Sequence, residues 1–491
     1  MLIRSSASVP GATVVVEDKF GRNINQHGLT LVDQDGYMAN PAIEFFIVPP
    51  PDAHYPAWAT VTANNERLYF DFPGTFGETG PSTHVYFADA HTKVPLYIGN
   101  APDRDSEDGH YQLTIRFTDS ARQTSILMIP IHEIDQDRPG AAPRPGITVD
   151  FSQDRTGFFN SARAREIVLR AVADWAYFFD DMKLDPVPAG AESTDIWDPD
   201  GFNSQHTVTN AKEYDGYLLY VYGVHGSMLR SGGSVSSEGP VQTSGGRPLP
   251  LRRSGGVAVE TAGNYNELGW FLDSSDADWW VSGNMADEQN DLFAIVHHET
   301  GHAIAFDVGQ PKWREFKEHG CLNDPAVIAY HGVCPKISSD DHFPGAIDNE
   351  SLKGGFGNEY YGIVPNRRWI ITKFDLLAAQ AVGYKLRRTS AFIPTAILSN
   401  SVDAGTVGRD YSMALRAEGG IPFYNWTIAA GQLPPGLALD SFSGVISGTP
   451  RAAGTWSFTV RLQDYAEGAT GVTRSLAITV NAPATGRAKT S

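Results

Sequence analysis

Short runs of β-branched and aromatic residues, separated by clusters of glycine and proline, recur near both ends of this chain and restrict its fold more than any other feature. Residues 42–48 and 67–72 form such runs near the start, and residues 453–460 form one near the end. Glycine and proline account for 49 and 31 of the 491 residues, which together exceed the usual share of roughly 12%. A chain so rich in turns favours β-sandwich modules over helical bundles.

Length and charge exclude several classes of protein. A chain of 491 residues exceeds the roughly 250–300 residues that one hydrophobic core supports, so we expect two to four domains. The formal charge is −19, which argues against a nucleic-acid partner, because binding to phosphates requires a positively charged surface. No apolar run reaches the roughly 20 residues that span a bilayer. Residues 1–6 lack the apolar centre of a signal peptide; the protein either stays inside the cell or is a mature secreted or cell-surface form, and we favour the second.

Residues 1–145 are expected to form a β-sandwich of the Ig or fibronectin type. A proline-rich segment at 138–145 marks its end. The strand-like runs, the last two of which look like a closing hairpin, lie at 13–17, 42–48, 67–72, 111–117 and 124–131.

Residues 146–388 are expected to form an α+β domain. A long helix should begin near Ser161, because apolar residues recur after it at spacings of three and four. A Gly/Ser-rich stretch at 231–246 is expected to be a loop. The other helices are expected at 290–306 and 373–382, and the strands at 147–151, 216–222 and 256–260.

Residues 389–484 carry a recognisable string of three segments. These are Leu433-Pro434-Pro435-Gly436-Leu437, Gly444-Val445-Ile446-Ser447-Gly448-Thr449-Pro450 and Ala453-Gly454-Thr455 followed by a strand. The string resembles a family of Ig-like modules (the He-PIG type) of bacterial surface and secreted proteins. The resemblance implies an Ig-like β-sandwich with a spacing or adhesion role, including surface or glycan contact. Residues 485–491 are expected to be a disordered tail.

The two cysteines, Cys321 and Cys334, lie close together in the sequence. Their spacing would close a small disulfide loop worth about 3 kcal/mol. The alternative is a pair of unrelated buried thiols.

The segment His298-Glu299-Thr300-Gly301-His302 carries the sharpest chemical signal. On a helix its two histidines lie within about 40° of each other on one face, so both imidazoles can bind one Zn²⁺. Glu299 can then reach the water that the metal activates and act as general base. His297 lies about 100° round the helix and is expected to be a bystander or a second-shell group. The alternative is that this common short pattern arose by chance.

On these residues, the region 147–388 resembles a metzincin-type zinc metallopeptidase, nearest to the leishmanolysin-like branch. In that branch a long insertion precedes the third ligand, and the later segments read H-W-E, E-L-M-x-G and a helix ending in D-x-G-Y. This chain has Asp341-His342-Phe343, Glu350-Ser351-Leu352-Lys353-Gly354 and a segment ending in Val382-Gly383-Tyr384. It departs from the family at Ala305, where the family has glycine, and at Leu352, where the family has the methionine of the turn beneath the metal.

The residues alone do not identify the third zinc ligand. The position six residues after His302, which metzincins normally use, is Val308, and Asp307 faces away on a continuing helix. The resemblance implies His342, which would complete a three-His site with one open position. The remaining candidates are Glu350, His319 and His331.

Two further features carry weaker signals. The Tyr360-Tyr361 pair follows the turn-like segment, where the phenol of Tyr361 could stabilise an oxyanion or simply be a half-buried aromatic. The segment 198–203 (DPDGFN) resembles a short Ca²⁺ loop, although solvated turns of this composition are common.

Together these features predict a secreted zinc endopeptidase that hydrolyses peptide bonds of proteins, with Glu299 as base and His298, His302 and His342 as ligands. The first alternative is a catalytically weak or inactive metallopeptidase-like adhesion or binding protein, which the two flanking β-modules favour. A purely structural zinc site is the other, although such sites normally fill four protein ligands.

Overall fold

The computed structural model divides the chain into two compact units, residues 1–388 and 389–491. The expected boundary at 138–145 and the expected tail at 485–491 lie outside the described residues. Across the described ranges, no helix is both long and apolar enough to cross a membrane. The structure describes residues 14–33, 40, 42–65, 67–71, 81–100, 107–136, 146–179, 185–225, 232–236, 242–244, 247–249, 253–261, 270–272, 290–307, 309–339, 341–343, 371–387, 394–420, 424–465 and 470–483.

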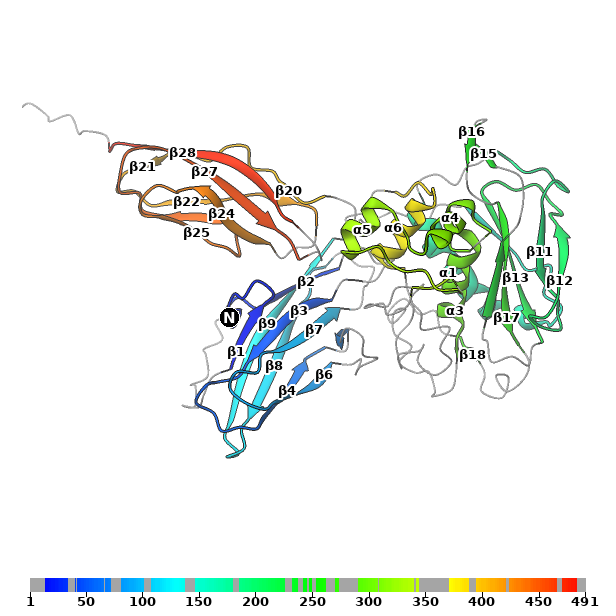
Figure 1. Ribbon diagram of the computed structural model, residues 1–491, viewed down its shortest axis with the longest axis horizontal. Helices are drawn as coiled ribbons and strands as arrows, with labels where there is room; N and C mark the ends of the chain where they lie inside the picture. Colours follow the sequence, from blue (N-terminus) through cyan, green and yellow to red (C-terminus); the bar gives the residue numbers. More distant parts are fainter. Residues whose placement is uncertain are drawn as a thin grey trace, which may run out of the picture. The chain divides into compact units, whose positions relative to one another are not determined.

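The N-terminal part contains two sheets, as the sequence predicts (Figure 1). One sheet has the order β2 (Leu29–Asp33), β9 (Thr124–Asp135), β8 (His110–Thr118), β4 (Ala57–Ala63) and β6 (Ser82–Phe87), and the other β1 (Val15–Asp18), β3 (Ile43–Val48), β7 (Val94–Asn100) and β5 (Leu68–Asp71). Buried residues alternate with less buried ones along β3, β4 and β6, so each sheet has one inward face. Asn100 of β7 donates a hydrogen bond to Glu133 of β9 and links the two sheets. The predicted hairpin is β8–β9.

A four-stranded mixed sheet organises the central region. Its order is β10 (Ile147–Asp150), β13 (Tyr217–Val224), β17 (Ser254–Glu260) and β14 (Gly232–Ser236). The first three strands are parallel, and β14 runs antiparallel to β17. The prediction of a loop over 231–246 is therefore wrong in part. The backbone of residues 232–236 pairs with β17 despite a composition that is poor in strand formers, and residues 242–244 form β15 (Gln242–Ser244), which pairs with β16 (Arg247–Leu249).

Both faces of this sheet are covered. Helices α1 (Ala162–Phe178) and α3 (Leu292–Ile304) lie on one side, and the hairpin of β11 (Ser193–Trp197) and β12 (Gln205–Thr209) lies on the other (Figure 1). Every residue of β13 and of β17 is buried. Along β13, Leu218, Tyr220 and Tyr222 join the apolar cluster under the hairpin, whereas Tyr217 reaches the helix side and donates to the carbonyl of Ala303, 2.5 Å away.

Helices α1 and α3 begin at the capping residues that the sequence supplies. Ser161 accepts a hydrogen bond from the Ala164 amide at the start of α1, and Asp291 accepts one from the Phe293 amide at the start of α3. The two helices contact each other closely at Gly301. A Cβ placed there would lie 2.9 Å from the ring of Trp175, so the residue before His302 has to be small.

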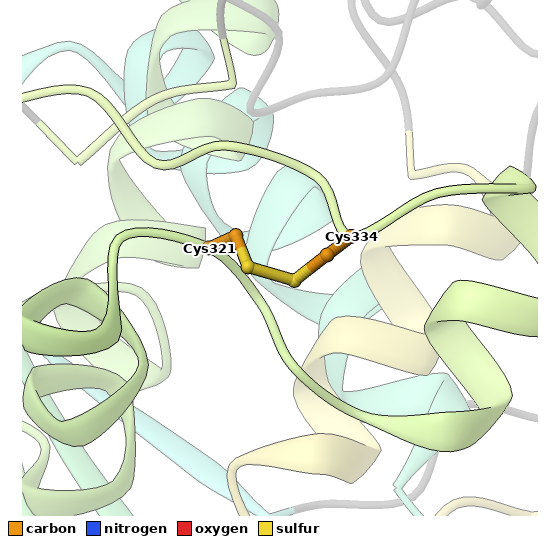
Figure 2. The surroundings of a disulfide bond; sticks show 2 residues. All are labelled: Cys321 and Cys334. Atoms are coloured by element: carbon orange, nitrogen blue, oxygen red, sulfur yellow. A yellow bond between two sulfur atoms is a disulfide. The ribbon is translucent and has the colours of Figure 1, made fainter.

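Three shorter helices follow α3: α4 (Pro311–His319), α5 (Pro325–His331) and α6 (Lys373–Ala381). Helix α6 begins with a capping box between Thr372 and Asp375. It corresponds to the helix that the sequence predicts at 373–382. Cys321 and Cys334 form the predicted disulfide, which joins the segment after α4 to the segment after α5 (Figure 2). The same two segments are paired through the backbone of Cys321 and Lys336.

The described part of the C-terminal unit contains a four-stranded, a three-stranded and a two-stranded sheet, and its core includes Trp426 and Phe458. Glycines of the recognised string allow a close contact between its backbone segments, because a Cβ at Gly448 (φ 132°) would lie 2.1 Å from the carbonyl oxygen of Gly436. The four-stranded sheet has the order β21 (Gly405–Thr406), β28 (Val472–Asn481), β27 (Gly454–Gln463) and β24 (Asn425–Gly431). The three-stranded sheet has the order β22 (Tyr411–Ala414), β26 (Val445–Gly448) and β25 (Leu437–Leu439). The remaining short elements are η1 (Phe158–Asn160), β15 (Gln242–Ser244), β16 (Arg247–Leu249), β18 (Trp270–Phe271), β19 (Asn290–Asp291), β20 (Ala396–Ile397) and β23 (Ala417–Glu418).

Gly301→Ala tests the contact between α1 and α3. Alanine is favoured over glycine in a helix by about 1 kcal/mol, but crowding the buried Trp175 ring should cost about 1–3 kcal/mol. We expect net destabilisation, measured as a lower midpoint of urea unfolding, and partial rescue by Trp175→Phe, which frees space in the same contact. Equal or greater stability of the Gly301→Ala variant would show that the two helices are not in tight contact there.

Removing the disulfide should lower the free energy of unfolding by about 3 kcal/mol, because a short loop is no longer closed in the unfolded chain. The measurement is urea unfolding of the Cys321→Ser/Cys334→Ser variant against the oxidised protein. Thiol titration of the unfolded, unreduced protein should find no free cysteine. Two titratable thiols would contradict the assignment.

Candidate metal centre

Helix α3 carries the sequence motif, and all 13 of its residues are buried. His298, Glu299 and His302 are 1%, 7% and 8% exposed. Apolar residues supply most of the remaining helix surface, which packs against α1, β14 and β17. The helix therefore places two imidazoles and a carboxylate at the margin of a core, where polar groups need partners.

Three imidazoles converge at one point. The Nε2 atoms of His298 and His302 lie 3.1 Å apart, and the Nε2 atom of His342 lies 3.2 Å from the first and 3.3 Å from the second. Nitrogens bound tetrahedrally to Zn²⁺ at about 2.0–2.1 Å lie about 3.3 Å from one another. The donor set and its spacing therefore fit a zinc ion. Among the residues that the structure describes, this is the one group of three or more potential ligands within metal-binding reach.

The hydrogen bond of His302 fixes which nitrogen faces the centre. Its Nδ1 lies 2.9 Å from the carbonyl oxygen of Phe306, and because a carbonyl only accepts, Nδ1 carries the proton. The Nε2 atom of a neutral His302 then presents a lone pair to the other two imidazoles. If the Nε2 atoms of His298 and His342 are unprotonated as well, three lone pairs meet at this point and a cation among them is favourable. A backbone partner of this kind is what ligating histidines normally have.

His342 comes from a turn that follows the disulfide loop, 44 residues after His298. Of the other candidates for third ligand, His319 and His331 are not part of the cluster, and neither is Asp307. His331 instead has its ring 5.6 Å from that of Phe374. Glu350, Leu352, Tyr360, Tyr361 and Val308 lie outside the described residues, so the predictions made for them are not addressed by the structure.

His297 and Asp174 form a buried pair on the other side of α3. The His297 Nε2 atom lies 3.5 Å from the Asp174 carboxylate, and both side chains are almost fully buried. Trp175 donates to the His297 carbonyl at 2.8 Å. His297 thus belongs to the α1 interface rather than to the histidine cluster. The sequence gives no signal for its pairing with a residue more than 120 positions earlier.

The acidic turn at 198–203 is held by a hydrogen bond between Asp198 and His206. The Asp198 carboxylate lies 2.6 Å from Nδ1 of His206. Hydrogen bonding from Ser204 is the largest effect on the pKa of Asp198, and together with the His206 hydrogen bond it holds this pKa below its usual value although burial raises it. The described residues gather no carboxylate cluster here. The geometry therefore lends the predicted Ca²⁺ site no support.

Glu260, at the end of β17, is a buried carboxyl of the central sheet. Burial raises its pKa to about 7, and its side chain is 1% exposed. Its backbone carbonyl accepts a hydrogen bond from the indole of Trp270 at 3.1 Å. It is separate from the histidine cluster.

Comparison with known proteins identifies the C-terminal unit alone. Residues 394–481 match the family model described as "Putative Ig domain" (He_PIG), so the chain has an Ig-like domain at its C-terminus, as the sequence string predicts. No curated protein matches the chain. The matched model does not extend to residues 146–388.

Solved structures resemble the chain only slightly. A Bacteroides fragilis protein named "putative alpha-galactosidase" is 24% identical over 18% of this chain, with a TM-score of 0.16, and the match spans 17% of that protein. A PapD-like domain of human CEP192 is 10% identical over 28% of this chain and 95% of its own, with a TM-score of 0.16. Likenesses this slight support no conclusion about function.

If the three histidines form one metal centre, the purified protein should hold about one zinc per chain. His298→Ala and His342→Ala should each remove it, because two imidazoles bind zinc far more weakly than three. His319→Ala, at the exposed end of α4, is the matched control and should keep it. Metal analysis after dialysis decides the matter, and a His342→Ala variant that retains full zinc would exclude His342 as a ligand.

Proposed function

We propose that the protein is a zinc-dependent endopeptidase that hydrolyses peptide bonds of protein substrates. The observation that supports it best is the convergence of the His298, His302 and His342 Nε2 atoms beside Glu299, which follows His298 on the same helix. Three histidines leave a fourth position of a tetrahedral metal open for water and substrate, as in catalytic sites. Among the described residues, these three histidines form the one group within metal-binding reach.

Zinc held by these residues would supply Lewis acidity, which lowers the pKa of water and polarises a carbonyl group. Glu299 is the general base in this proposal: it takes the proton of the attacking water and returns it to the leaving amine. Glu299 lies between the two histidines in the sequence. On the helix it points about 100° from His298 and about 60° from His302, so its carboxylate lies beside the histidine face, which suits the role of base. Burial of the site excludes competing water from the carboxylate.

Strand β14 is the proposed binding site for extended substrate. Within the described part of the chain it pairs only with β17, so it forms an edge of the central sheet. It also packs against α3, the helix with the motif. A peptide that adds to this edge by backbone hydrogen bonds would run alongside the histidine cluster. The strand at 256–260 lies inside the sheet and is not available for this role.

The resemblance to leishmanolysin-like metzincins agrees with this proposal, and the departure at Ala305 has a physical explanation. Ala305 ends α3 with φ −136° and ψ −40°. A residue with negative φ has no need to be glycine, so the chain can leave the helix here and still place the Phe306 carbonyl against His302.

A secreted or cell-surface location is part of the same proposal. The chain contains a disulfide, a bond that persists mainly in oxidising compartments. It also contains an Ig-like domain, of a kind suited to spacing or adhesion.

Glu299→Gln should keep the bound zinc and lower casein cleavage by at least about 100-fold, because the amide cannot accept the proton. Glu315→Gln, an exposed change on α4, is the control and should cleave normally. Undiminished cleavage by Glu299→Gln would refute the assignment. Wild-type protein that binds zinc and cleaves no unfolded substrate would favour the alternative, a metallopeptidase-like adhesion protein.

A further inference from the structure

The turn that presents His342 is closed by its own hydrogen bonds. The Ser338 amide and hydroxyl both donate to the His342 carbonyl, at 2.8 and 2.9 Å. The His342 amide donates back to the Ser338 hydroxyl oxygen at 3.0 Å. The direction of the imidazole therefore depends on the backbone of this turn, and in particular on Asp341, the residue before it.

Asp341 has an unusual backbone conformation, with φ at +65°. Side chains other than glycine adopt this left-handed region rarely, and aspartate is among those that tolerate it. Such a conformation persists only where the surrounding structure enforces it, and such residues cluster at functional sites. The structure shows what enforces it here.

Helix α4 holds both carboxylate oxygens of Asp341. Trp313 donates from its indole nitrogen to Oδ1 at 2.7 Å, and Lys317 donates from Nζ to Oδ2 at 2.8 Å. Lys317 also donates to the Ser339 carbonyl at 2.8 Å. The two donors are one helical turn apart on α4, so they lie on one face of it.

The same tryptophan connects this turn to the helix that bears the other two histidines. The Trp313 ring lies 5.3 Å from that of Phe306, directly after α3, and 5.7 Å from that of Phe343, directly after His342. Phe343 also packs on Phe374 of α6, with ring centroids 4.8 Å apart. Both sequence neighbours of His342 are thus held in place, Asp341 through its carboxylate and Phe343 through its aromatic ring.

We propose that Asp341 is a positioning residue whose contacts with Trp313 and Lys317 hold His342 in place to bind the metal. The inference rests on the proposed zinc site. It requires no contact between Asp341 and the metal or substrate. Partners that orient a ligand in this way typically change metal affinity by about 10–100-fold when removed.

The experiment measures the zinc dissociation constant of the full chain by competition with a chromogenic chelator. Asp341→Ala removes both contacts and disfavours the left-handed backbone, and we expect a constant about 10–100-fold higher. Asp341→Gly permits the backbone but removes the contacts, and it should also bind more weakly. Asp341→Asn fills the same space but offers one acceptor oxygen instead of two to the two donors of α4. It should bind zinc more weakly than the wild type and more tightly than Asp341→Ala, whereas a merely space-filling role predicts wild-type affinity.

Changes on α4 test the same contact without altering the turn. Lys317→Ala should weaken zinc binding in the same direction but less. Lys312→Ala, on the same helix, should have no effect, because Lys312 contacts Glu315 and the Phe316 ring rather than the turn. Wild-type affinity in folded Asp341→Ala, alongside loss of zinc in His342→Ala, would overturn the positioning role and leave the metal site intact. Failure of the wild type to bind zinc would overturn both.

Discussion

The burial of α3 is the constraint on which the rest of the central region depends. A helix that is enclosed along all 13 residues has to place two imidazoles and a carboxylate where water is scarce, and unpaired polar groups there are costly. The surrounding structure meets part of this demand. Tyr217 and Trp175 bond to helix carbonyls, and the Phe306 carbonyl accepts from His302. The Nε2 atoms of His298, His302 and His342 meet at one point, an arrangement that a bound cation would stabilise.

The third histidine reaches this point through a chain of contacts rather than by proximity in sequence. The disulfide and the backbone pairing of Cys321 with Lys336 bring the segments after α4 and α5 together. The next residues form the turn that ends in His342. Trp313 of α4 contacts both parts of the centre: its ring packs on Phe306 after α3, and its indole nitrogen donates to Asp341 in the turn. The packing around the three histidines holds their side chains in place. Such preorganisation suits a metal site, because the ligands are already in position when the metal binds.

The sequence predicted those features that depend on local periodicity or on short covalent loops. Helices at α1, α3 and α6, the hairpin β8–β9 and the disulfide are of this kind, and the string around Gly436 and Gly448 predicted the Ig-like domain. The choice of His342 over His319 or His331 could not be derived from spacing, because it depends on tertiary contacts of Asp341 and Phe343. Strand β14 was missed because its glycines and serines signal a loop, whereas pairing with β17 decides its conformation.

The central claim is that His298, His302 and His342 hold one zinc ion and leave a position open. X-ray absorption at the zinc edge of the purified protein tests it most directly, because the signal reports the number and type of ligands. We expect about three imidazole nitrogens near 2.0–2.1 Å together with one oxygen ligand, and no sulfur. A zinc surrounded by four protein ligands, or a spectrum without multiple imidazole scattering, would contradict it.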